Sequence, residues 1–300
     1  MKDFTAYLES KGLAKTTQKE YLLRTKLFLN WVKKEDIQIT KPDVLNYLEY
    51  LKNHKKNNNV TRAITLIAIR YYFNYLFEND FITQNPCWVL KIRGTQVKKL
   101  YKVYSTEALD DLYDNFYNFY IRSYEPSKYI GKASQEHIKL TRYRNLTVLG
   151  ILIYQGVQTL ELKNIKLDDV DLQKAKIKIT SSKHARERTL PLKASQIGIL
   201  INYIQNIRPE LNCSEYLFDF ENHKYNDIIK HLTHQIIKID KNFKNFWQIR
   251  TSVITNWLKT ENLRKTQYFA GHRSVMATEC YIPNNLEELI EDITQKHHFL

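Results

Sequence analysis

Apolar residues along the first 92 positions recur three and four apart, the period at which side chains return to one face of an α-helix. Four such runs follow one another, beginning near Phe4, Tyr21, Val44 and Ile64. No convincing run in this part of the chain alternates between apolar and polar residues as a half-buried strand does. The pattern therefore predicts a small helical domain over residues 1–92.

Residues 93–104 differ from both of their neighbours because they are basic, contain Gly94 and show no helical period. Glycine and a lack of periodicity are typical of connections. We predict an interdomain linker at 93–104, which leaves residues 105–300 as a second domain. Its helical pattern starts at Ser105, and a polar run with Pro126 and Gly131 predicts a surface insertion over residues 122–139.

Between residues 163 and 192 the period changes from helical to alternating. The alternating runs are Val170–Leu172, Ala175–Ile179 and Arg188–Leu192, and a polar turn separates the last two. They predict one small antiparallel sheet. From Ser195 onward the pattern is again mostly helical, so the expected fold class is mainly α with a small antiparallel β-sheet, in two domains.

The composition of the chain indicates the kind of partner that it binds. The chain has 46 Lys and Arg against 32 Asp and Glu, and its net charge of +14 suits a densely negative partner such as nucleic acid. An apolar fraction of 43% is ample for a core in each domain. Charge alone leaves the class open, because lysine-rich proteins without nucleic-acid partners also exist.

Other features narrow the class. Cys87, Cys213 and Cys280 are far apart and show no metal-binding spacing, so neither a disulfide framework nor a zinc site is predicted. The N-terminus has no apolar stretch typical of a signal peptide, and no run approaches the roughly 18 apolar residues that span a bilayer. We expect no membrane role and a location in the cytosol, such as that of a bacterium, or on its nucleoid.

Chemistry concentrates near the C-terminus. Arg250 falls on an amphipathic helical pattern, Gly271 and His272 close a second short helix, and Tyr281 follows nine residues after the histidine. An arginine holds a phosphate bidentately and an imidazole hydrogen-bonds another of its oxygens. A phenol then attacks the phosphorus once that charge is neutralised. The set suits phosphoryl transfer onto tyrosine.

The order and spacing of these residues resemble the tyrosine recombinases, the phage-integrase and Xer-type family. The motifs of that family are R-(H)-(S/T), then (L/F)-(A/G)-G-H, then T-x-x-Y. The counterparts here are Arg250–Ser252, Phe269–His272 and Thr278–Tyr281. The segment Lys183–Leu192 also resembles the family's β-hairpin, in which Lys183 falls on the lysine that protonates the departing 5′-hydroxyl. A solvated turn lysine is the alternative interpretation of Lys183.

Two positions depart from the family's pattern. Gly156–Leu162 resembles the family segment T-G-x-R-x-x-E-L, but Gln158 stands where the first phosphate-binding arginine is expected. Trp247 stands where the family has histidine or lysine, three residues before Arg250. An amide and an indole still donate hydrogen bonds, but neither adds charge or accepts a proton.

Another cation would have to replace the missing arginine. Arg142 and Arg144 are the candidates on the preceding segment. Arg144 lies 14 residues before Gln158, about 21 Å along a straight helix, so a direct replacement requires a break in that helix.

The resemblance implies a helical core-binding domain followed by a catalytic domain. It implies that Tyr281 attacks a DNA phosphate without metal or cofactor and forms a 3′-phosphotyrosine, in recombination or integration of a mobile element. The implied partners are duplex DNA and further copies of the chain, as a tetramer on two DNA sites. The segment Leu286–Ile293 is apolar on one helical face and packs either on a neighbouring protomer or on its own domain.

Two alternatives remain. The chain is either an active strand transferase or a DNA-binding protein on the recombinase fold that lost cleavage with the changes at Gln158 and Trp247. A third class, a basic helical transcription regulator or RNA-binding protein, leaves the coincidence of the motifs unexplained. A covalent protein–DNA adduct discriminates between the first two.

Overall fold

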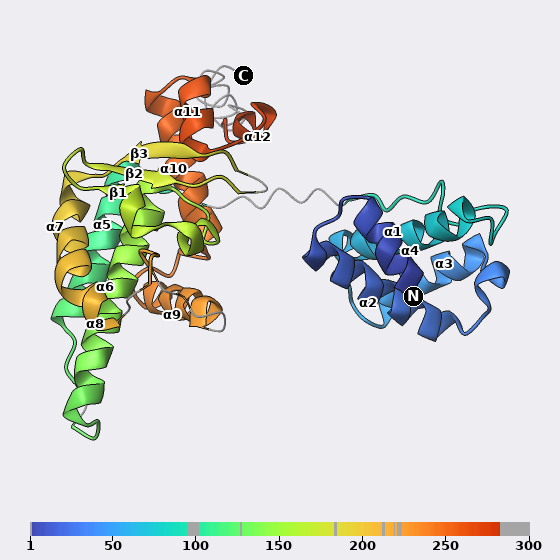
Figure 1. Cartoon of the computed structure of the whole chain (residues 1–300), viewed down its shortest axis with the longest axis horizontal. Helices are drawn as coiled ribbons and strands as arrows, with labels where there is room; N and C mark the ends of the chain where they lie inside the picture. The colour runs from blue at the N-terminus through green and yellow to red at the C-terminus, as the bar shows by residue number, and fades with distance from the viewer. Residues whose placement is uncertain are drawn as a thin grey trace, which may run out of the picture. The chain divides into compact units, whose positions relative to one another are not determined.

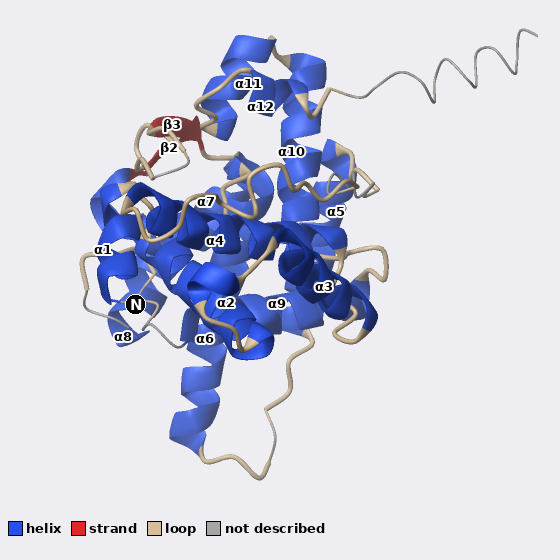
Figure 2. Ribbon diagram, turned by 90° about the vertical axis from the view of Figure 1, so that its right-hand side faces the viewer, coloured by secondary structure: helices blue, strands red, loops and turns tan. Residues whose placement is uncertain are grey.

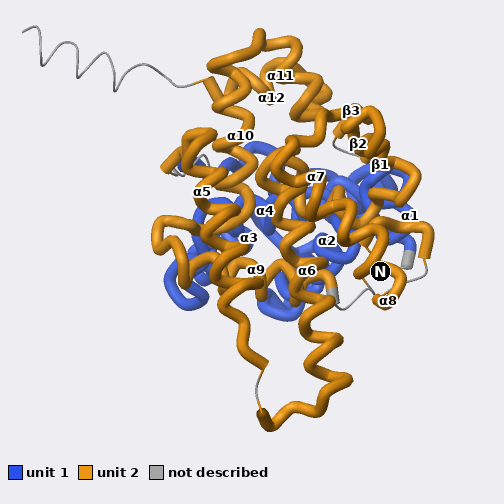
Figure 3. Tube along the Cα trace, turned by 90° about the vertical axis from the view of Figure 1, so that its left-hand side faces the viewer, with its two compact units in different colours: residues 1–100 blue, residues 101–300 orange. Residues whose placement is uncertain are grey.

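The computed structural model describes residues 2–94, 102–126, 128–182, 185–211, 214–218, 220 and 224–282. The chain forms two compact units, residues 1–100 and 101–300 (Figure 3). Each unit buries its own hydrophobic core, and the two cores share no residue.

Helices make up most of the first unit. Its described residues hold α1 (Lys2–Ser10), α2 (Lys15–Val32), α3 (Lys41–Asn53) and α4 (Asn59–Glu78), with a 3-10 turn at Asp36–Gln38. None of these residues forms a strand, which agrees with the helical pattern of the sequence. Aromatic side chains that are fully buried make much of the core, among them Phe4, Phe28 and Phe73.

The buried face of α4 differs from the apolar stripe visible in the sequence. Leu66, Ile69 and Phe73 are buried, whereas Ile64 and Ile67 are 37% and 38% exposed. The helix carries apolar residues on most of its circumference, so their spacing predicts a helix without defining which side packs inward.

The second unit surrounds a small sheet with helices. Its described helices are α5 (Thr106–Tyr117), α6 (Lys132–Gln155), α7 (Ala194–Asn202), α8 (Arg208–Leu211), α9 (Lys224–Ile239), α10 (Phe246–Thr260), α11 (Leu263–Ala270) and α12 (Met276–Glu279). Figure 1 shows α11 and α12 beyond β3, at the opposite end of the unit from the first turns of α6. The Tyr268 hydroxyl of α11 accepts a hydrogen bond from the Thr189 N–H at 2.9 Å, which ties α11 to the sheet.

The sheet has three antiparallel strands in the order β1 (Val170–Asp171), β2 (Lys176–Ile179) and β3 (Arg188–Pro191). All three are labelled in Figure 1, and β2 and β3 are drawn red in Figure 2. Ile177 pairs with Leu190 and Ile179 pairs with Arg188. Ile177, Ile179 and Leu190 are buried. The predicted mainly α fold with a small antiparallel sheet is therefore confirmed, and its register places Arg188 on the buried face beside Leu190.

The predicted surface insertion is shorter than the sequence suggested. Helix α6 begins at Lys132, within the segment 122–139 that was predicted as a surface insertion. The polar connection after the π-helical turn Asn118–Arg122 therefore ends at Gly131. Residues 132–139 are polar because most of them face solvent, yet Ala, Gln, Glu and Lys are good helix formers. The polar composition of residues 132–139 therefore reflects exposure to solvent and not irregular structure.

Candidate active site

Arg250 lies on α10 and is only 5% exposed. Its Nη1 donates to the carbonyl oxygen of Gly156 at 2.5 Å, and its Nη2 donates to that of Ala270 at 2.7 Å. These carbonyls stand at the C-terminal ends of α6 and α11, where backbone oxygens lack partners within the helix and carry partial negative charge. Two helix ends thus hold the guanidinium in one position.

Both helix ends require glycine. Gly156 has φ +55° and Gly271 has φ +70°, values that glycine adopts without steric cost. A Cβ on Gly156 would lie 2.8 Å from Cγ1 of Val253, and one on Gly271 would lie 2.6 Å from Nη1 of Arg188. The glycine of the Gly-His pair is therefore fixed by both backbone conformation and packing.

A buried ion pair joins β3 to the segment that follows α6. Arg188 donates to both carboxylate oxygens of Glu161, at 2.7 and 2.9 Å, and the two side chains are 0% and 3% exposed. Glu161 also accepts the backbone N–H of Gln158 at 2.7 Å. Because Glu161 neutralises Arg188 and the guanidinium is fully buried, this arginine is structural.

Three aromatic rings meet beside Arg250. Tyr281 follows the short helix α12, and its ring stacks on that of His272 with centroids 5.6 Å apart and 19° between the planes. The ring of Trp247 lies 6.5 Å from that of Tyr281. The structure therefore brings four of the predicted residues together: Arg250, His272, Tyr281 and Trp247.

The environment sets the protonation of these groups. Burial, together with the charges of Arg250 and Arg188, lowers the pKa of His272 to about 4, so the imidazole is neutral at neutral pH. Burial raises the pKa of Tyr281, and Arg250 opposes that rise through its charge and a hydrogen bond. The phenol is therefore protonated until something accepts its proton.

Gln158 occupies the position of the missing arginine, and its side chain is half-buried. Helix α6 runs unbroken from Lys132 to Gln155, so Arg144 cannot approach Gln158. Arg142 lies between the rings of Tyr120 and Tyr124, 4.0 Å from each centroid. The replacement by an arginine of α6 that the sequence left open is excluded by the continuous helix.

Lys183 and His184 lie outside the described residues, but the chain on either side of them is held at the site. The Arg186 N–H donates to the Gly271 carbonyl at 2.8 Å, and Ala185 pairs with His272 as an isolated β-bridge. Arg273 donates to the Ser182 carbonyl at 2.9 Å. The hairpin turn is thus attached to the loop that carries His272.

Sequence reasoning assigned no contact at the site to three residues that contribute to it: Arg188, Arg273 and Thr278. A detectable signal existed for Arg188, because strand alternation places it on the same face as Leu190, and a charged residue on a buried face needs a partner. Thr278 bonds to His272 and is fully buried. Arg273 does not stand out in the sequence. Thr278 begins the T-x-x-Y motif, but its contact with His272 depends on the folded loop and could not be predicted.

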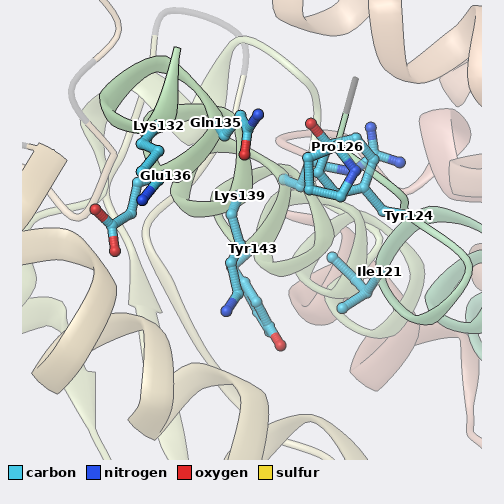
Figure 4. A pocket seen from close by; sticks show the side chains of 9 residues that line it. Ile121, Tyr124, Pro126, Lys132, Gln135, Glu136, Lys139 and Tyr143 are labelled. Carbon is cyan, nitrogen blue, oxygen red and sulfur yellow. The ribbon is translucent and has the colours of Figure 1, made fainter. Parts of the chain in front are cut away.

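A separate hollow of about 550 Å³ lies where the π-helical turn meets the first half of α6 (Figure 4). Lys139, Tyr143 and Ile121 are among the side chains that line it. Arg142 lines it too, but Arg250, His272, Tyr281 and Trp247 do not, so this hollow is separate from the candidate site. Among the described residues, no cluster of His, Cys, Asp and Glu could hold a metal, and no helix is long and apolar enough to cross a membrane.

Comparisons with known proteins agree with this geometry. Residues 128–288 match the model of the phage integrase family, and residues 1–83 match that of the phage integrase N-terminal SAM-like domain. The chain is 25% identical to the tyrosine recombinase XerD of Listeria innocua, over 93% of this chain and 92% of that protein. It is 23% identical to the TnP I resolvase of Bacillus thuringiensis, over 95% and 96%.

Solved structures share the fold. A lambda integrase dimer bound to a COC′ core site superposes with a TM-score of 0.67 at 14% identity, covering 93% of each chain. The XerH recombinase bound to its difH substrate before cleavage superposes with a TM-score of 0.66 at 20% identity, covering 96% of this chain and 84% of that one.

Fold, motifs and relatives together define a tyrosine-type DNA strand transferase. The chain belongs to the phage integrase family, because the family model matches more than half of its length.

The buried ion pair generates a stability prediction. Glu161→Gln should lower the free energy of unfolding by about 3–5 kcal/mol, because it leaves the Arg188 charge buried without a counter-charge. Chemical unfolding followed by circular dichroism measures the change. Glu215→Gln is the matched control, since Glu215 pairs with Lys166 at 2.8 Å on the exposed surface and should cost less than about 1 kcal/mol. Equal effects of the two substitutions would contradict the role given to the buried pair.

The ion pair between Glu161 and Arg188 also predicts how the stability of the protein changes with pH. Burial raises the pKa of Glu161, but the hydrogen bonds and charge of Arg188 outweigh it, so this pKa lies below its ordinary value. The stabilisation is therefore present above the ordinary carboxyl pKa and is lost as the pH falls through the lower, folded-state pKa. The difference in the free energy of unfolding between wild type and Glu161→Gln should therefore become smaller as the pH falls through the folded-state pKa of Glu161.

Proposed function

We propose that the chain is a site-specific recombinase that cuts and rejoins duplex DNA through a 3′-phosphotyrosine at Tyr281. The observation that carries the proposal is the convergence of Tyr281, His272 and the buried Arg250 at one surface. Arg250 is held so that its remaining N–H groups can bind a phosphate, and fixed donors stabilise a transition state better than mobile ones.

The reaction exchanges one phosphate ester for another. The Tyr281 oxygen attacks phosphorus, the bond from phosphorus to the 5′-oxygen breaks, and the products are a 3′-phosphotyrosine and a free 5′-hydroxyl. Lys183 would supply the proton to the 5′-oxygen, since an alkoxide is a poor leaving group. The ester keeps the bond energy for rejoining, so the steps require no nucleotide.

The partner that we propose is duplex DNA. The net charge of +14 suits a polyanion, and similar folds are described in complexes with a core site and with a difH substrate. We propose that four protomers assemble on two such sites, with the segment Leu286–Ile293, which lies outside the described residues, as a candidate contact. The mass of the protein–DNA complex tests this assembly.

A second candidate function is a DNA-binding protein without strand cleavage. Two observations favour it: Gln158 adds no positive charge, and the Trp247 indole cannot exchange a proton. In this second candidate the chain still binds DNA, so the two candidates differ only in the covalent step.

The Tyr281→Phe variant tests the nucleophile. Wild type incubated with nicked target-site DNA should give an adduct that survives denaturant and disappears on protease treatment. Tyr281→Phe should bind the same DNA with equal affinity and give no adduct, because it lacks the attacking oxygen. An adduct in the variant would assign the nucleophile to another tyrosine, and no adduct in wild type would favour the second candidate function.

Lys183 is tested by changing the leaving group. Lys183→Ala should slow adduct formation on normal DNA, on the order of a hundredfold or more. It should react nearly as wild type when sulfur replaces the scissile 5′-oxygen, because a thiolate departs without protonation. An equal loss on both substrates would limit Lys183 to binding DNA.

Gln158→Arg tests the altered position. The backbone of Gln158 is held by Glu161, so an arginine there would start from a fixed point beside Arg250. The single-turnover rate of adduct formation should rise on the order of a hundredfold with little change in DNA affinity, because the added charge acts on the transition state. Gln158→Met is the control of similar length and should be slower than wild type. A rate that stays unchanged or falls in Gln158→Arg would mean that the site is built around the amide.

A further inference from the structure

The two ring nitrogens of His272 face different partners. Nδ1 lies 2.9 Å from Oγ1 of Thr278, a residue that is 0% exposed. Nε2 lies 3.4 Å from Nη2 of Arg250. The ring face stacks on Tyr281. His272 is therefore held on one side by a buried hydroxyl and directs its other nitrogen toward the phosphate-binding arginine.

These contacts determine where the single proton of the neutral ring resides. A guanidinium donates hydrogen bonds and never accepts them. The contact between Arg250 and Nε2 is favourable only when Nε2 carries a lone pair. It therefore favours the tautomer with the proton on Nδ1, where Oγ1 of Thr278 can accept it. In this tautomer Nε2 can accept a proton, but it cannot donate one to a phosphate oxygen. The ring of Tyr281 lies against the same imidazole, and the Tyr281 hydroxyl is hydrogen-bonded to Arg250, the residue that Nε2 also faces.

We propose that His272 accepts the hydroxyl proton of Tyr281 at Nε2, and that Thr278 is the positioning residue that keeps the other proton on Nδ1. The inference rests on the proposed function and adds the proton acceptor to it. A proton acceptor is needed because Trp247 stands where the family pattern has histidine or lysine, and an indole cannot take a proton.

The proton balance is complete. The Tyr281 proton moves to Nε2 as the phenolic oxygen bonds to phosphorus, and the resulting imidazolium donates its new N–H to a phosphate oxygen. Rejoining returns that proton to Tyr281. Nε2 of His272 thus accepts a proton first and binds the phosphate afterwards. The hydrogen bond from His272 to the phosphate, which the sequence led us to expect, therefore forms only after Tyr281 has lost its proton.

The charges around the His272 ring favour proton transfer from Tyr281 only when DNA is bound. Arg250 from α10 and Arg188 from β3 disfavour an imidazolium, and Glu161, from the turn after α6, favours it. Tyr281 faces the ring from the segment after α12. A phosphate placed against Arg250 adds negative charge beside Nε2, which raises the proton affinity of the ring.

The tautomer is measured in the full-length protein without DNA. Nitrogen-15 NMR of the histidine rings distinguishes protonated from unprotonated nitrogens, and His272→Gln identifies the signals of His272. We expect a proton on Nδ1 in wild type and in Thr278→Ser. Thr278→Val, which has the same shape but no acceptor, should shift the proton toward Nε2. A wild-type ring protonated on Nε2 would overturn the proposal.

The chemical role is measured as the single-turnover rate of adduct formation. Thr278→Val should be slower on the order of a hundredfold with unchanged DNA affinity, and Thr278→Ser should recover most of the rate. If neutral His272 acted only as a donor from Nε2, Thr278→Val would react as fast as wild type or faster, and that result overturns the proposal. A wild type without any adduct defeats the proposed function instead, while the NMR experiment still decides whether Thr278 positions the ring.

Discussion

The ion pair between Glu161 and Arg188 is the interaction on which the rest of the site depends. It is fully buried, and it links the end of the sheet to the turn that follows α6. Glu161 also holds the backbone of Gln158, and Arg188 lies so close to Gly271 that no Cβ fits between them. Gly156, whose carbonyl binds Arg250, lies two residues before Gln158, and Ala270, the other carbonyl partner, directly precedes Gly271. The ion pair therefore supports both segments that hold Arg250, the arginine proposed to bind the phosphate.

This arrangement also limits the charge available for catalysis. Arg188 is neutralised by Glu161, and His272 is neutral because burial and the neighbouring arginines lower its pKa. Among the described residues that enclose Tyr281, Arg250 therefore supplies the main positive charge. A transition state that gains negative charge needs compensation. Gln158 adds no charge, and Arg142 and Arg144, which lie in the middle of α6, cannot add theirs beside Gln158 because the helix continues unbroken to Gln155.

The sequence predicted the elements, and which candidate residues lie together, better than it predicted the neighbours of those residues. Arg250, His272 and Tyr281 were predictable because chemistry fixes their residue types and the chain fixes their spacing. The buried side of α4 could not be predicted, because Ile64 and Ile67 are as apolar as the residues that pack inward. The start of α6 at Lys132 was missed because solvent-facing helical turns are as polar as loops. The contact of Thr278 with His272 depends on a folded loop that no periodicity describes.

The stretch from Gly271 to Tyr281 concentrates most of the proposed chemistry. It contains the glycine that packs on Arg188, the imidazole, the buried Thr278 hydroxyl and the nucleophile, connected through α12, a helix of only four residues. So short a helix is not stable by itself, and the hydrogen bond between Thr278 and His272 joins its last turn back to the Gly-His pair. The proposed proton acceptor, His272, and the proposed nucleophile, Tyr281, are thus positioned by the same local contact. The rest of the unit then has to supply only Arg250 and the hairpin that carries Lys183.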